Sequence, residues 1–206
     1  MLRFGLIILL LAAFAVSGRA ERGFFLKNGD RVLVLGDSNT AAGGYVQYLE
    51  AYLTTRFPEQ RFELINLGLP SETASGLSEP DHPWPRPDVH ERLDRALERV
   101  HPDVVLACYG MNDGIYYPFS KERFTRYQSG IRKLVDRVRR SGARLVLVTP
   151  PPFDPEPVRE KTLPITASKF SWVQPYARYD DVLARYSDWL LTLRDEGIPV
   201  VDAHTP

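Results

Sequence analysis

Short apolar runs alternate along the chain with segments in which apolar residues recur every three or four positions. The runs are β-branched or continuously apolar, which is typical of buried parallel strands. They cover residues 31–36, 62–67, 103–109, 143–149 and 198–201. The segments between them predict amphipathic helices, and Gly142 and Gly197 stand where helix C-caps are expected. This order predicts an α/β chain, a parallel sheet between helices with its site at the carboxyl ends of the strands.

The first 20 residues differ from the rest of the chain. Arg3 precedes an apolar stretch over residues 5–16, and small residues follow up to Ala20. This is the pattern of a secretory signal peptide, and the apolar run is shorter than the roughly 20 residues of a membrane span. We expect a signal peptide over residues 1–20, one mature domain over residues 21–206, and a secreted or periplasmic protein without stable membrane insertion after cleavage.

Composition excludes several kinds of partner. Lys plus Arg and Asp plus Glu both number 26, which leaves no excess positive charge to hold a nucleic acid. Cys108 is the single cysteine, and no Cys/His spacing resembles a zinc site. The two glycine-rich phosphate-binding motifs, G-x-G-x-x-G and G-x-x-x-x-G-K-[ST], are both missing from the sequence. We therefore expect no metal, no cofactor and no nucleic-acid partner, whereas the oligomeric state stays open.

A serine follows the first predicted strand, within the segment Gly36-Asp37-Ser38-Asn39-Thr40. A serine at a strand-to-helix turn exposes its hydroxyl at the top of a parallel sheet, and the start of the helix favours negative charge nearby. The alternative is that Ser38 only caps the following helix, which is a common use of serine.

The next two strands end in residues that could stabilise an oxyanion. The second runs into Asn66-Leu67-Gly68, and the third into Gly110-Met111-Asn112. Acyl transfer needs donors aimed at the oxygen of the tetrahedral intermediate, and a backbone N–H with an asparagine amide supplies them. Asn and Gly alone are also common turn formers, but their order on successive strands favours the catalytic interpretation.

These three segments resemble blocks I, II and III of the SGNH hydrolases, also called the GDSL lipase/esterase superfamily. The resemblance covers nearly the whole mature chain. It implies a three-layer α/β/α sandwich with a five-stranded parallel sheet of the flavodoxin-like kind. It also implies Ser38 as the nucleophile and an oxyanion hole formed by the Ser38 and Gly68 amides and the Asn112 side chain. Wider stretches, among them NLGLPSET and TPPPFDP, are similar to a branch of the superfamily near carbohydrate esterases.

The fourth block of the superfamily, D-x-x-H, has no counterpart in the sequence. None of the four histidines follows an aspartate by three positions, and His204 follows Asp202 by two. In relatives, an aspartate at the end of strand five resembles a structural position. We therefore expect the catalytic Asp and His, with a final helix, to lie beyond Pro206, which would leave apolar sheet surface exposed and the chain prone to associate. The alternative is that Asp202 and His204 are themselves the catalytic pair.

Three long loops leave the predicted carboxyl ends of strands, over residues 68–86, 110–119 and 150–175. They are rich in aromatic residues, namely Trp84, Tyr116, Tyr117, Phe119, Phe153, Phe170, Trp172 and Tyr176. Flat rings beside Arg86, Lys161 and Lys169 suit a sugar better than a long acyl chain, although Phe119 and Phe153 are expected to pack the loops onto the sheet. We therefore expect a secreted serine esterase that removes acetyl or another short acyl group from carbohydrates. The alternatives are a lipid or aryl ester hydrolase and a non-catalytic glycan-binding domain.

Overall fold

The computed structural model describes residues 25–205, so the expected signal peptide lies outside the described residues. All five strands are parallel and form one sheet in the order β2-β1-β3-β4-β5. The strands are β1 (Arg31–Gly36), β2 (Glu63–Asn66), β3 (Val104–Cys108), β4 (Arg144–Val148) and β5 (Val200–Val201). This is the flavodoxin-like order, in which the chain changes direction across the sheet between β1 and β3. The predicted fold class is confirmed.

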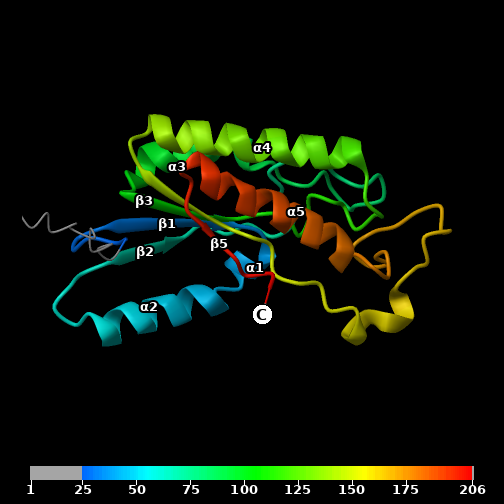
Figure 1. The fold of residues 1–206 in the computed structure, drawn as a ribbon, viewed down its shortest axis with the longest axis horizontal. Helices are drawn as coiled ribbons and strands as arrows, with labels where there is room; N and C mark the ends of the chain where they lie inside the picture. The colour runs from blue at the N-terminus through cyan, green and yellow to red at the C-terminus, as the bar shows by residue number, and fades with distance from the viewer. Residues whose placement is uncertain (1–24, 206) are drawn as a thin grey trace, which may run out of the picture.

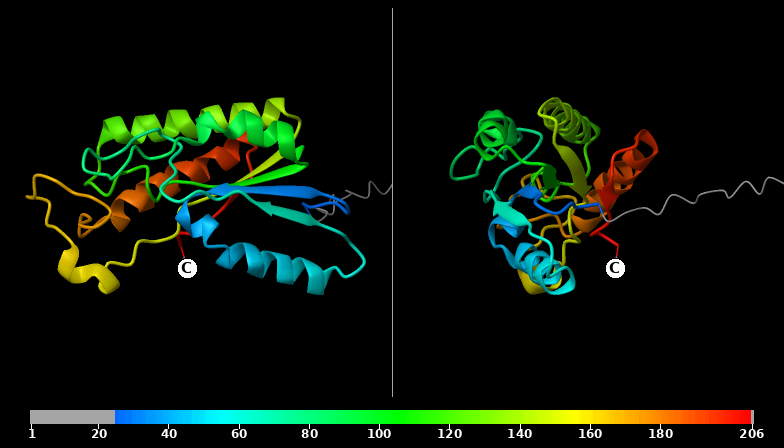
Figure 2. Two further views of the ribbon diagram at one scale, coloured as in Figure 1. Left: turned by 180° about the vertical axis from the view of Figure 1, so that it is seen from behind. Right: turned by 90° about the vertical axis from the view of Figure 1, so that its left-hand side faces the viewer.

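Helices cover both faces of the sheet, as Figure 1 and the end view in Figure 2 show. One face carries α3 (Leu93–Val100), α4 (Lys121–Arg140) and α5 (Asp180–Thr192), and the other carries α2 (Gly44–Arg56). A one-turn helix, α1 (Ser38–Ala41), follows β1 directly. Three 3₁₀ turns complete the elements, η1 (Val89–Glu91), η2 (Glu156–Lys161) and η3 (Leu193–Glu196). The sheet is thus the middle of three layers.

Residues of each strand alternate between the two faces, because successive side chains of a strand point in opposite directions. Leu33 and Leu35 belong to the large buried cluster that includes residues of α3, α4 and α5. Val32 and Val34 belong to a smaller cluster with Val46 of α2. The main hydrophobic core therefore lies on the three-helix face.

The α2 face is only partly covered. An apolar pocket of about 430 Å³ opens between Leu49 of α2 and the sheet, where Leu106, Val148 and Val201 line it. Val201 is 51% exposed. A single helix thus leaves the apolar surface of β4 and β5 in contact with solvent.

Local signals in the sequence explain two of the helix ends. Gly142 has φ 83° and Gly197 has φ 76°, the left-handed conformation expected after a helical segment. The helical pattern between the second and third predicted strands does not form one continuous helix but is divided into η1 and α3. Arg92 separates the two, and its guanidinium donates to the Leu67 carbonyl and to both carboxylate oxygens of Glu72. Contacts with the loop after β2 hold the residue at which the helix breaks.

Over residues 25–205, every helix is too short or too polar to cross a membrane.

Candidate active site

Ser38 lies at the carboxyl end of β1, as the first residue of α1. Asp37 is the N-cap of this helix, and its carboxylate accepts a hydrogen bond from the Asn39 amide at 2.9 Å. The interpretation of Ser38 as the helix cap is therefore wrong. Ser38 is exposed, and within residues 25–205 neither its hydroxyl nor its amide has a hydrogen-bond partner. Both groups are free to meet a substrate.

Glycine is required at the turn that presents Ser38. A Cβ at Gly36 would lie 2.1 Å from Thr40 Oγ1 and 2.7 Å from the Cys108 carbonyl oxygen. No side chain fits between α1 and the end of β3, since such distances are far below van der Waals contact. The first glycine of the motif thus lets α1 fold back against the sheet.

Gly68 lies directly beside α1. A Cβ at this position would be 2.3 Å from the Ala41 nitrogen, and the neighbouring Asn66 donates from Nδ2 to the Thr40 carbonyl at 2.7 Å. The Gly68 amide itself donates to Asn66 Oδ1 at 2.9 Å. The predicted oxyanion donor therefore adjoins the Ser38 turn and has an internal acceptor that an oxyanion would have to replace.

Asn112 is buried, with 3% of its surface exposed, in the loop after β3. Its Nδ2 donates to the Glu72 carbonyl at 3.2 Å, and its Oδ1 accepts from the Tyr116 hydroxyl at 3.1 Å. Because an amide carries two N–H groups, one hydrogen remains without a partner among the described residues. Backbone hydrogen bonds from Leu69 to Gly36 and from Glu72 to Leu69 connect this region to the Ser38 turn.

Buried charges surround these donors. Glu72 is fully buried and accepts from Arg92 and from the Tyr109 hydroxyl, at 2.5 to 2.6 Å. Burial raises the pKa of Asp37 to about 6, with a further increase from the negative charge of Glu72, while hydrogen bonding to Asn39 opposes the shift. The site thus has a carboxyl group next to Ser38 that titrates near neutral pH.

Arg86 does not face a substrate as the sequence led us to expect. It is 5% exposed and binds Glu79 through two nitrogens, at 2.6 and 2.7 Å. Its guanidinium lies 5.5 Å from the centre of the Tyr116 ring. Glu79 is the paired carboxylate that a buried guanidinium needs. The contact of Arg86 with Tyr116 shows that Arg86 supports the 110–119 loop.

Asp113, which sequence reasoning did not single out, fixes the loop after β2. Its Oδ1 accepts from the Ala74 and Ser75 amides, at 2.9 and 2.8 Å. Burial raises the pKa of this carboxyl to about 7, although both amides oppose the shift. Asp113 thus ties the loop that contains Glu72 to the loop that contains Asn112.

Asp202 and His204 do not form an oriented pair. Asp202 Oδ1 accepts from the Thr149 hydroxyl and from the His204 and Thr205 amides, at 3.0 to 3.3 Å. The His204 ring instead places Nε2 3.9 Å from Asp180 Oδ2, and its Nδ1 is buried with no partner among the described residues. Asp202 closes a turn at the end of β5.

The other three histidines make their hydrogen bonds elsewhere or cap a helix. His82 bonds the Trp84 carbonyl at 2.5 Å, and His90 bonds the Gly130 carbonyl at 3.1 Å. His101 is the C-cap of α3, which precedes the amino-terminal end of β3. Over the described part of the chain, no histidine is hydrogen-bonded to the Ser38 hydroxyl.

Two aromatic residues of the long loops are largely exposed, Trp84 at 59% and Trp172 at 54%. The two loops that carry them approach each other, since Lys169 Nζ lies 3.4 Å from Asp81 Oδ2. The remaining rings mostly pack inward. Phe153 contacts Tyr179 as expected, whereas Phe119 is 36% exposed, with Arg185 4.5 Å from its centre. The aromatic surface available to a ligand is therefore smaller than the sequence suggests.

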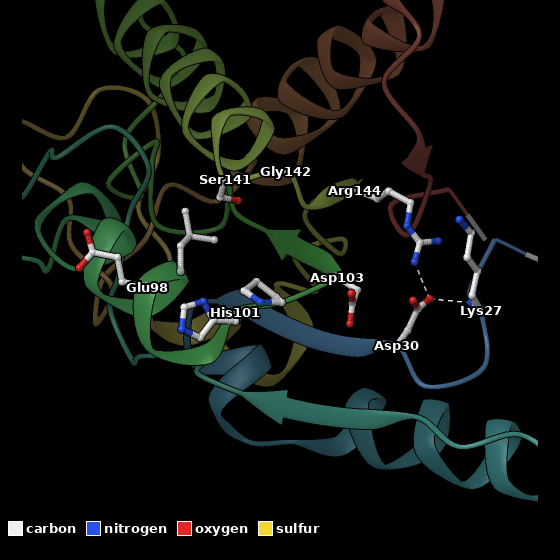
Figure 3. Close-up of a pocket in the computed structure, with 10 residues that line it drawn as sticks. Lys27, Asp30, Glu98, His101, Asp103, Ser141, Gly142 and Arg144 are labelled. Atoms are coloured by element: carbon white, nitrogen blue, oxygen red, sulfur yellow. Dashed lines mark hydrogen bonds and ion pairs between the residues drawn. The ribbon is translucent and has the colours of Figure 1, made fainter.

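A pocket of about 580 Å³ lies at the opposite, amino-terminal end of the strands (Figure 3). There Asp30 accepts from Arg144 at 2.5 Å and from the Lys27 amide at 2.6 Å. Ser141 in this pocket donates to the Val138 carbonyl at the end of α4. The pocket does not combine a free hydroxyl with oxyanion donors, so the Ser38 end is the candidate site.

Residues 25–205 hold no cluster of three metal-ligating side chains.

Solved structures of esterases share this fold. An acetylxylan esterase from Geobacillus stearothermophilus, solved as catalytic serine, aspartate and histidine variants, aligns with a TM-score of 0.62 at 19–20% identity, over 87% of this chain and 78% of that one. The acetyl xylan esterase AlAXEase aligns with a TM-score of 0.58 at 18% identity, over 84% and 77%. A gut microbial diltiazem-metabolizing enzyme aligns with a TM-score of 0.60 at 23% identity, over 88% of this chain and 38% of that one. No curated protein sequence matches the chain.

The family is established by sequence. The sequence pattern of the GDSL-like lipase/acylhydrolase family matches residues 34–206, from within β1 to the last residue. The match includes all three segments identified above, with Ser38, Gly68 and Asn112. The chain therefore belongs to the GDSL-like lipase/acylhydrolase family and is, by family, a serine ester hydrolase.

Proposed function

We propose that this protein is an exported esterase that removes short acyl groups, acetyl in particular, from carbohydrates through an acyl-enzyme on Ser38. The observation that carries the proposal is the geometry of Ser38. Its hydroxyl and its amide are both unpartnered within residues 25–205, and the hydrogen bonds from Leu69 to Gly36 and from Glu72 to Leu69 connect the Ser38 turn to the loop whose Glu72 carbonyl holds the Asn112 amide. A nucleophile and donors for the developing oxyanion are two of the requirements of acyl transfer.

In this mechanism the Ser38 oxygen attacks the ester carbonyl carbon and gives its proton to a water molecule, because no histidine among residues 25–205 is hydrogen-bonded to the Ser38 hydroxyl. The carbonyl oxygen becomes an oxyanion that accepts from the Ser38 amide, the Gly68 amide and Asn112 Nδ2. The Gly68 amide gives up its hydrogen bond to Asn66 Oδ1 and donates to the oxyanion instead. Collapse of the intermediate expels the sugar oxygen, which takes up the proton, and water then releases the acyl group from Ser38.

Three observations support a carbohydrate ester as the substrate. Trp84 and Trp172 expose flat rings on loops that meet through Lys169 and Asp81, and such rings suit sugar faces. Two of the structural neighbours described above are acetylxylan esterases. Residues 1–20 have the pattern of a signal peptide, which fits an enzyme that meets polysaccharides outside the cytoplasm.

A hydrolase of longer acyl esters is the second candidate, and the apolar pocket on the α2 face favours it. Asn39, the residue after Ser38, lines this pocket of about 430 Å³ together with Leu49 and Val201. A cavity of this size and composition accommodates an apolar chain.

The test compares acetylated xylooligosaccharides with p-nitrophenyl esters of increasing acyl length. A preference for acetyl, together with saturation by the oligosaccharide, supports the carbohydrate proposal. A preference for long chains that is lost in Val201→Asp supports the second candidate. Binding of the oligosaccharide without release of acetate by either the parent chain or Ser38→Ala would indicate a glycan-binding domain and contradict both.

A further inference from the structure

Ile115 and Tyr116 follow Asn112 in the loop after β3, and both have left-handed backbone conformations. Their φ angles are 48° and 62°. Non-glycine residues rarely adopt this region, and a β-branched isoleucine least of all. Strained conformations persist where surrounding contacts over-determine them, and they cluster at functional sites. Two consecutive left-handed residues therefore indicate that contacts with the rest of the fold hold Tyr116 in place.

Three contacts from two other segments hold Tyr116, two of them on its ring and one on its backbone. It stacks on Tyr179 with centroids 4.8 Å apart and planes 22° apart, and Arg86 lies over the ring at 5.5 Å. Its carbonyl accepts from the Tyr176 amide at 2.9 Å. Arg86 is fixed in turn by the buried Glu79. The position of the Tyr116 hydroxyl is thus set by the tertiary structure.

That hydroxyl donates to Asn112 Oδ1 at 3.1 Å, while Asn112 Nδ2 donates to the Glu72 carbonyl at 3.2 Å. A flipped amide would place its oxygen against the Glu72 carbonyl, and two acceptors repel each other. A donor on Oδ1 also polarises the amide and strengthens its remaining N–H as a donor. Burial raises the pKa of Tyr116 to about 12, so the hydroxyl keeps its proton at neutral pH.

We propose that Tyr116 is a positioning residue that holds the Asn112 amide in the orientation needed to bind the oxyanion. The proposal rests on the proposed function, because there Asn112 binds the oxyanion. It adds a supporting residue outside the three family segments. Tyr116 acts through Asn112 and does not itself contact the reacting atoms.

The test uses Tyr116→Phe, which removes the hydroxyl and keeps the stacked ring. Acetylation of Ser38 by p-nitrophenyl acetate should slow about tenfold, with unchanged half-saturation and a nearly unchanged melting temperature. Tyr117→Phe is the matched control, because the Tyr117 hydroxyl makes no hydrogen bond within the described residues and its loss should have no effect. In an Asn112→Ala background, Tyr116→Phe should cause no further loss.

An equal loss in both backgrounds, or an unaltered rate in Tyr116→Phe, would overturn the proposal. If the parent chain shows no acetylation, that result counts against the proposed function alone. NMR then tests whether Tyr116 holds Asn112 without the need for any reaction. The side-chain amide NMR signals of Asn112, identified by their absence in Asn112→Ala, should shift in Tyr116→Phe and not in Tyr117→Phe. Signals that stay in place would show that Tyr116 does not hold Asn112.

Discussion

The carbonyl oxygen of Ala74 lies against the backbone of Gly130, where any larger residue would place its side chain. A Cβ at Gly130 would be 1.9 Å from that oxygen. The loop after β2 therefore rests directly on α4, and the same loop contributes the Glu72 carbonyl that holds Asn112. Packing between a helix and a loop thus positions a donor of the candidate site.

Gly130→Ala should destabilise the protein. Alanine gains about 1 kcal/mol over glycine in a helix, but overpacking against a backbone atom costs about 1–3 kcal/mol, and the rigid carbonyl cannot move aside cheaply. Because the added Cβ would lie only 1.9 Å from that oxygen, the cost is at the upper end of this range, and we expect a net loss of about 2 kcal/mol in urea unfolding. Gly44→Ala is the control, because nothing lies within 4 Å of its added Cβ, and it should be neutral or stabilising. Equal behaviour of the two variants would show that the contact does not limit stability.

Asp113→Asn should change how stability depends on pH. The pKa of Asp113 is raised to about 7 by burial, so the folded state binds this proton more tightly than the unfolded state. Its contribution to stability is fully present below about pH 4 and is lost as the pH rises toward about 7. The asparagine variant keeps an acceptor for the Ala74 and Ser75 amides and cannot ionise.

The melting temperature of Asp113→Asn relative to the parent chain should therefore increase from about pH 4 to about pH 7 and level off above that. A thermal shift series in one buffer system across this range measures it. A difference that stays constant with pH would mean that Asp113 is ionised throughout.

Asn112→Ala should lower turnover with little change in substrate affinity. An oxyanion donor contributes about 2.7–4 kcal/mol to the transition state, or roughly a hundred- to a thousandfold in rate. Steady-state kinetics on an acetyl ester separates kcat from KM. A variant that lost affinity alone would assign Asn112 to shaping the loop.

His204→Ala should leave acetylation of Ser38 by an activated ester unchanged. Asp202 bonds the Thr149 hydroxyl and two backbone amides and does not orient the His204 ring. Stopped-flow release of p-nitrophenol gives the rate. A large decrease, with the melting temperature preserved, would make His204 the base that deprotonates Ser38.

The sheet could be predicted from sequence because each buried strand is a short apolar run bounded by turn residues. The strand at Arg31–Gly36 agrees at both ends. The others are shorter than predicted by one or two residues at an end, although Leu67, Asp103 and Thr149 still donate to the neighbouring strand. The positions of Ser38, Gly68 and Asn112 could be predicted for a related reason, since parallel strands bring their carboxyl ends to one edge.

The support of the site could not be predicted in the same way. Asp113 and Ala74 are 39 residues apart, and Asn112 and Glu72 are 40 residues apart, so no local periodicity links them. Arg86 was expected to face a substrate because it lies in a loop rich in aromatic residues, and only the fold reveals the buried Glu79 beside it. The left-handed backbone of Tyr116 has no signal in the sequence, since tyrosine does not favour that conformation.

The central claim is that Ser38 is the nucleophile, and mass spectrometry of the protein after reaction with p-nitrophenyl acetate tests it most directly. The account predicts one acetyl group on the peptide that contains Ser38, and none on that peptide in Ser38→Ala. This variant should unfold at the same temperature, because the exposed Ser38 hydroxyl makes no hydrogen bond within residues 25–205. Acetylation at another residue, with Ser38→Ala reacting as fast as the parent chain, would contradict the claim.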